Sequence, residues 1–114
     1  MLRTTAKRTL FLAVGLIGSA ASGQSAGQRS AYDYALKCWA VAGYIGNQDG
    51  ANAPEASGRR AFDAAYKMGS ILGYGNSQIK SDLDLTATVE GTAMLRNRDY
   101  FERSRSDCRK LGLL

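Results

Sequence analysis

Hydrophobic positions recur at helical spacing in four segments between residue 31 and the end of the chain. In the first segment, Tyr32, Leu36 and Trp39 share one face, and Cys38 and Val41 belong to an adjoining stripe. An apolar surface this broad is typical of a helix that is covered on several sides. The pattern therefore predicts a central first helix.

The second predicted helix begins with capping signals, because Asn52, Pro54 and Glu55 are residue types typical of a helix N-terminus. Its expected buried face consists of Phe62, Ala65, Tyr66, Gly69, Leu72 and Gly73. Small side chains recur every four residues along one edge: Ala61, Ala65, Gly69 and Gly73. Charged residues interrupt this edge, so it indicates close packing inside a bundle rather than pairing within a membrane. We expect the helix to end at Gly73 or Gly75.

The third segment has two readings. From Leu83 to Glu90, apolar and polar residues alternate strictly, which is the period of a half-buried strand. A helix is favoured, because a lone strand leaves its backbone groups unpaired and no second segment of the domain alternates over a comparable length. Asn76 or Ser77 is expected to cap this helix. Its expected inner face consists of Ile79, Leu83, Ala87 and Met94.

A break at Asn97 and Arg98 separates the fourth segment from the third. Asp99, with Glu102 three residues later, resembles a capping box at the start of a helix that Gly112 ends. Its expected inner face contains Phe101, Cys108 and Leu111. The four segments together predict an all-α protein, a small bundle of about four helices.

Residues 1–23 have the order of a secretory signal peptide: three basic residues, an uncharged apolar run, and small residues without stop-transfer charges. The run is shorter than the roughly 20 residues of a transmembrane helix. We therefore expect cleavage after Ala21 or Gly23, no stable membrane span afterwards, and a periplasmic or extracellular location.

After cleavage, residues 24–30 are expected to form a flexible lead-in, and residues 31–114 a single helical domain. The signal peptide takes three of the fifteen basic residues and none of the ten acidic ones, so the formal net charge falls from +5 to +2. Low net charge and export together argue against nucleic acid as a partner.

Cys38 and Cys108 are the two cysteines of the chain, and both fall on expected inner faces. In an exported domain this small, the pair predicts a disulfide that ties the first helix to the last. The alternative is a reactive thiol at Cys108, with Arg105 and Arg109 as nearby cations on the same helix.

The chemistry available to the chain is narrow. It contains no histidine, which removes the commonest general base and metal ligand. Two distant cysteines do not make a zinc site, and Asp82 and Asp84, the closest acids, point to different sides of a helix. We therefore expect a non-enzymatic protein without metal or cofactor.

Arginines are concentrated near the C-terminus, where Arg98, Arg105 and Arg109 are candidates for a face that binds anionic groups. The alternative is a solvated face in which basic residues pair with acids at helical spacing: Arg98 with Glu102, and Arg103 with Asp107.

The sequence thus favours a cell-envelope interaction module that binds an envelope protein or an anionic polymer. The alternative is a small carrier of an apolar ligand held between helices, with walls from Trp39, Tyr66, Met68, Tyr74 and Met94. The identity of the partner and the oligomeric state stay open at this point.

Overall fold

The computed structural model describes residues 26–47 and 55–114, and its regular structure in these ranges is entirely helical. The first helix covers residues 26–47, and it is followed by α2 (Glu55–Ile71), α3 (Asn76–Arg96) and α4 (Arg98–Lys110). The predicted all-α bundle is therefore confirmed, and Leu83 to Glu90 is helical. The predicted signal peptide with both cleavage points, and the expected caps at Asn52 and Pro54, lie outside the described residues.

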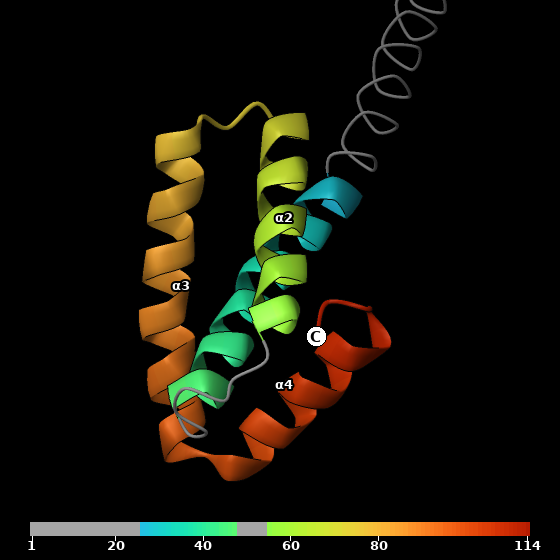
Figure 1. Cartoon of the computed structure of the whole chain (residues 1–114). Helices are drawn as coiled ribbons and strands as arrows, with labels where there is room; N and C mark the ends of the chain where they lie inside the picture. Colours follow the sequence, from blue (N-terminus) through green and yellow to red (C-terminus); the bar gives the residue numbers. More distant parts are fainter. Residues whose placement is uncertain (1–25, 48–54) are drawn as a thin grey trace, which may run out of the picture.

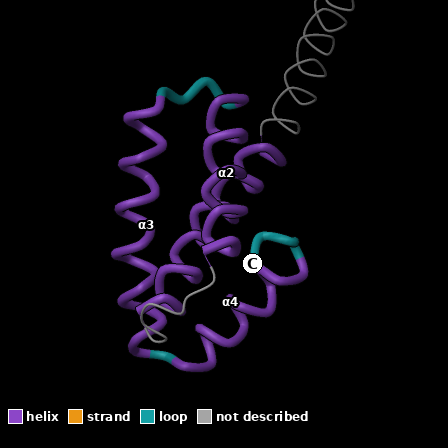
Figure 2. The backbone as a smooth tube through the Cα atoms, viewed as in Figure 1, coloured by secondary structure: helices purple, strands orange, loops and turns teal. Residues whose placement is uncertain are grey.

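The helices α2 and α3 form an antiparallel pair joined by a short connection, and the first helix runs obliquely across the pair (Figure 1). The chain then turns sharply after α3, so that α4 crosses the far end of the bundle (Figure 2). As a result, α3 packs against both α2 and α4 and forms one edge of the bundle.

The core consists of two apolar clusters that share the first helix. One joins the first helix to α2 and α3 through Tyr32, Ala35, Leu36, Ala65, Ile79 and Leu83. The other joins it to α2, to the end of α3 and to α4 through Cys38, Ala40, Val41, Ala61, Met94, Phe101 and Cys108. Trp39 packs against both clusters. The first helix is therefore central, as its broad apolar face predicts.

A disulfide joins Cys38 to Cys108, with 5.6 Å between their Cα atoms, and so ties the first helix to α4. Both cysteines are buried within the second cluster. A link across 70 residues stabilises the folded chain by about 4 kcal/mol in the chain-entropy account. Because each sulfur is bonded to the other, Cys108 has no free thiol in this structure.

The small-residue edge of α2 is where neighbouring helices approach most closely. Ala61 and Ala65 are fully buried on it. At Gly69, an added Cβ would lie 2.6 Å from Cδ1 of Ile79 and 3.0 Å from Cε1 of Tyr32. The absence of a side chain at Gly69 therefore allows α3 and the first helix to pack against α2 at this level.

Glycines end α2 and α4 in the same way. Gly73 has φ +86° and Gly112 has φ +72°, a left-handed conformation that glycine adopts without steric cost. After each helix, an amide donates back across the last turn, from Tyr74 to the Gly69 carbonyl at 2.9 Å and from Leu113 to the Cys108 carbonyl at 2.9 Å. These are Schellman endings. Each helix ends two residues before its expected glycine, α2 at Ile71 before Gly73 and α4 at Lys110 before Gly112.

The caps at the starts of α3 and α4 differ from the prediction. Gly75 is the N-cap of α3 and offers no side-chain acceptor, so neither Asn76 nor Ser77 is the cap. The extended conformation that follows the Schellman turn brings Gly75 to that position. At α4, Asn97 is the N-cap, and its side chain accepts a hydrogen bond from the Tyr100 amide at 3.0 Å. The capping box predicted from Asp99 is therefore wrong, because the residue at the break itself is the cap.

The expected lead-in is also corrected where the structure describes it, because residues 26–30 are helical. Arg29 lies 3.6 Å from the Asp33 carboxylate one turn later and donates a hydrogen bond to the Tyr74 hydroxyl at 2.9 Å. These contacts tie the beginning of the described helix to the connection between α2 and α3. Such long-range contacts have no signature in a short, polar segment of sequence.

Candidate interaction surface

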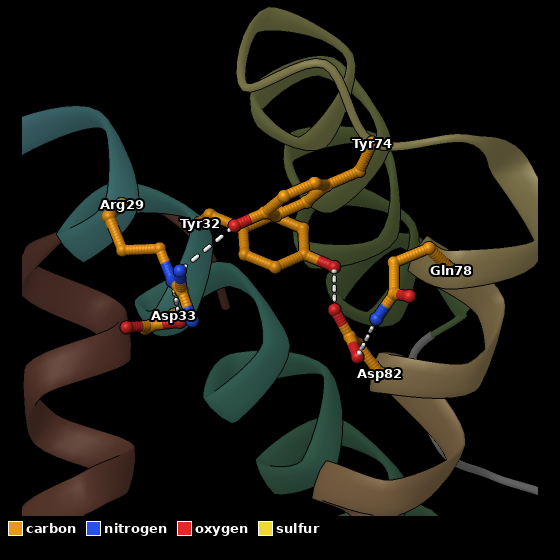
Figure 3. A network of polar contacts seen from close by, with 6 residues as sticks. All are labelled: Arg29, Tyr32, Asp33, Tyr74, Gln78 and Asp82. Atoms are coloured by element: carbon orange, nitrogen blue, oxygen red, sulfur yellow. Dashed lines mark hydrogen bonds and ion pairs between the residues drawn. The ribbon is translucent and has the colours of Figure 1, made fainter. Parts of the chain in front are cut away.

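A polar network joins the first helix to α3 near the α2–α3 connection (Figure 3). The Tyr32 hydroxyl donates to Oδ2 of Asp82 at 2.6 Å, and the Gln78 side-chain amide donates to Oδ1 of the same carboxylate at 2.8 Å. Burial, and then the hydrogen bond to Asp82, raise the pKa of the Tyr32 phenol far above its usual range. Tyr32 is almost fully buried, so its hydrogen bond to Asp82 holds the first helix to α3.

The predicted anionic-partner face on α4 is partly neutralised by its own chain. Glu102 lies between two of the three arginines and pairs with both, with Arg98 at 3.6 Å and with Arg105 three residues later. The Arg105 guanidinium also lies over the ring of Phe101, 5.3 Å from its centroid. Arg109 is exposed in the last turn of α4, where a cation is favourable to the helix end. The structure therefore does not bring the three arginines together as a free cationic surface.

Of the two ion pairs expected on α4, the structure forms one. Arg98 and Glu102 pair as predicted. No ion pair joins Arg103 to Asp107 in residues 98–110, and the pair of Arg105 with Glu102 was not predicted. Because the side chain of Arg98 is 82% exposed, its pair contributes little to stability.

The expected walls of an apolar ligand site pack against other core side chains. The rings of Trp39 and Phe62 lie 5.5 Å apart, and those of Phe62 and Tyr66 lie 4.9 Å apart. Met94 is 1% exposed in the cluster around the disulfide. These residues are accounted for by packing between helices.

The outer face of α3 is apolar and exposed, in contrast to the other helix surfaces discussed above. Leu85, Val89 and Leu95 are 64%, 58% and 71% exposed. In Figure 1, α3 lies at the edge of the bundle, and one of its sides has no other helix beside it. The sequence analysis did not identify this face, because it considered only the inner face of the helix.

Five of the exposed residues follow a regular spacing along α3. Intervals of four, three, four and three residues separate Ser81, Leu85, Thr88, Thr92 and Leu95, all of which are exposed. We call these five residues the outer seam. Alternating intervals of three and four are the spacing by which one helix packs lengthwise against another in a coiled coil. The outer seam therefore has the pattern of a helix-packing surface without a helix on it.

The two threonines of the outer seam are suited to burial. Thr88 donates its hydroxyl hydrogen to the Asp84 carbonyl at 3.1 Å, and Thr92 donates to the Thr88 carbonyl at 2.8 Å. Both hydroxyl hydrogens already have acceptors within α3. Covering these residues with a partner therefore leaves no hydroxyl hydrogen unpaired, which is the main cost of burying a polar group.

An open groove of about 370 Å³ lies on the other side of α3, between it and the first helix. Asp33, Tyr34 and Lys37 line it from the first helix, and Thr86 and Glu90 line it from α3. The groove is mixed in charge. The Tyr100 hydroxyl donates to Glu90 at 2.6 Å, and the Lys37 ammonium lies 4.9 Å from the centroid of the Tyr100 ring. These contacts hold both charged groups in place, and the groove has the size to accept a side chain from a bound partner.

Within residues 26–47 and 55–114, the structure contains no cluster of three or more side chains able to hold a metal ion. None of the helices in these ranges has the length and apolar character needed to cross a membrane. The fold and surface thus define a small all-helical protein closed by one disulfide, with an unpartnered helix face. Comparison with protein-family models, curated proteins and solved structures gives no match.

Proposed function

We propose that this protein is a non-enzymatic interaction module that binds its partner by packing a helix against the outer seam of α3. In this proposal residues 1–23 direct export and are removed, and the domain works in the periplasm or outside the cell. The buried disulfide supports this location, because disulfides persist in oxidising compartments.

The observation that carries the proposal is the exposure of two leucines, Leu85 and Leu95, on the outer seam, with Val89 exposed beside it. Leu85 and Leu95 are both more than three-fifths exposed, although core positions were available on the opposite face of the same helix. Exposed apolar residues that stand alone are ordinary on protein surfaces, whereas several of them grouped on one helix face indicate an interaction site. The partner is therefore expected to present a matching apolar helix.

This proposal changes the kind of partner expected from the sequence. A face of free arginines would select an anionic polymer, but Glu102 already pairs with Arg98 and Arg105. The outer seam contains no charged side chain. A protein helix is therefore the better match, and an envelope protein is preferred to an anionic polymer.

The proposal is tested by photo-cross-linking in the cell. A photoreactive residue is placed at Leu85, and in a matched variant at Arg109, which is exposed on the α4 surface. We expect specific adducts from position 85, and their loss when Val89→Asp is added to the same chain. Adducts from position 109 alone, at equal protein level, would contradict the proposal and favour the arginine face.

A further inference from the structure

We propose that the helix that covers the outer seam is the outer seam of a second copy of this chain, in antiparallel orientation. This inference rests on the proposed function and specifies its partner. The resulting pair has two-fold symmetry, so the same patch is used on both copies. Three features of α3 support this assignment: the register of its apolar residues, the charges at its ends, and the open edge at Gly91.

The register of the outer seam is self-complementary. With the two-fold axis on the outer side of α3 at the level of residue 90, Leu85 of one copy lies at the level of Leu95 of the second copy, and Thr88 lies at the level of Thr92. Each leucine is then covered by a leucine, and each threonine by a threonine. In coiled-coil notation, Leu85 and Thr92 occupy a positions, and Thr88 and Leu95 occupy d positions. The antiparallel register therefore pairs each a position of one copy with a d position of the other.

The charges at the two ends of α3 favour the antiparallel orientation. Asp82 and Asp84 lie in the N-terminal half of α3, where Lys80 is the one basic residue, whereas Arg96 ends α3 and Arg98 begins α4. An antiparallel pair places the acidic end of each helix beside the basic end of the other, whereas a parallel pair places like charges side by side. In the described part of the chain, neither Asp84 nor Arg96 takes part in an ion pair, so both are available for this role.

Gly91 opens one edge of the interface. A Cβ added there would meet no atom within 4 Å, because the position faces away from the bundle. The missing side chain lets a second backbone approach α3 near the middle of the outer seam. A contact of about three helical turns is smaller than the roughly 800 Å² per partner of a standard interface, so we expect a dissociation constant on the order of 10–100 µM.

Sedimentation equilibrium of the purified, oxidised protein tests whether the second copy binds. We expect a monomer–dimer equilibrium between about 1 µM and 1 mM, a range that brackets the expected affinity. Leu85→Asp and Leu95→Asp should each weaken the dimer at least about tenfold, because each buries a carboxylate against a leucine. Leu111→Asp is the matched control. Leu111 is 51% exposed and follows α4, so this change should leave the equilibrium unaltered.

Intermolecular photo-cross-linking of the same protein tests the orientation. With the photoreactive residue at Leu85, peptide mapping of the cross-linked dimer should place the adduct within residues 92–96 of the second copy. An adduct within residues 82–88 would indicate a parallel pair and would overturn the inference. A protein that stays monomeric to about 1 mM would also overturn it.

The result in the cell separates this inference from the proposed function. Adducts between position 85 and another protein, together with a monomeric purified protein, would overturn the second-copy inference and leave the proposed function standing. Adducts of twice the chain mass from position 85 support both. No adduct from position 85 and no self-association would contradict both.

Discussion

The close approach at Gly69 gives a prediction that compares two glycine-to-alanine changes in helices. Alanine is more favourable than glycine inside a helix by about 1 kcal/mol. At Gly91 this gain is free of steric cost, because nothing lies within 4 Å of the added Cβ. At Gly69 the Cβ would lie 2.6 Å from Ile79 and 3.0 Å from Tyr32, and both neighbours are buried.

The magnitude at Gly69 follows from these distances. Overpacking a core costs about 1–3 kcal/mol, and here two buried side chains on two other helices must move. After the helix gain is subtracted, Gly69→Ala should lower the free energy of unfolding by up to about 2 kcal/mol, whereas Gly91→Ala should raise it by about 1 kcal/mol. The two variants should therefore differ by the overpacking cost itself, about 1–3 kcal/mol.

Thermal and denaturant unfolding, followed by circular dichroism of the oxidised proteins, measures this difference. For a domain of this size, each 1 kcal/mol shifts Tm by about 4–8 °C. The comparison is made at low protein concentration, so that self-association does not contribute. A Gly69→Ala protein as stable as Gly91→Ala would refute the packing described between α2, α3 and the first helix.

Further predictions concern single groups in the core. Because its pKa is raised by burial and by Asp82, the neutral Tyr32 phenol stabilises the fold fully below about pH 10, and this contribution is lost as the pH rises further. Tyr32→Phe should therefore flatten the alkaline fall in Tm measured from about pH 10 to pH 12; an equally steep fall would contradict this role. Ser104 is buried, and its hydroxyl has no hydrogen-bond partner among the described residues, so Ser104→Ala should raise the free energy of unfolding by about 1 kcal/mol in urea titrations. Replacing Cys38 and Cys108 together by alanine should lower it by about 4 kcal/mol, and a loss under about 1 kcal/mol would show that the disulfide constrains little.

The strand-like alternation in α3 has a physical explanation in the structure. Successive helical residues are turned by about 100°, so positions two apart lie on nearly opposite sides of the helix. Leu83 and Ala87 pack inward, whereas Leu85 and Val89 lie on the exposed face. A helix that is apolar on two opposite faces therefore has a period near two in its sequence. The alternation of apolar and polar residues that made this segment ambiguous therefore results from its second, exposed apolar face.

The bundle and its disulfide could be predicted because they depend on local periodicity and on two cysteines alone. Helical spacing placed Cys38 and Cys108 on inner faces, and no other cysteine competes for either. The inner face of α3 was predicted on the same basis, and Ile79, Leu83 and Met94 are buried there.

The caps and ion pairs were harder to predict, because several residues within one turn can perform the same role. Asn97, Asp99 and Glu102 all lie near the start of α4, and the direction of the turn decides that Asn97 is the cap. Glu102 is then free to pair with Arg98 and Arg105. The neutralisation of the predicted arginine face therefore depends on three-dimensional placement rather than on residue type.

The central claim, that the outer seam is covered in the working state of the protein, is tested most directly by oxidative footprinting. Hydroxyl-radical modification is measured by mass spectrometry in the protein's native compartment and on the dilute purified protein. Modification of Leu85 and Leu95 should fall several-fold in the native compartment, while that of Leu111 stays constant. Equal modification of all three leucines in both settings would contradict the account.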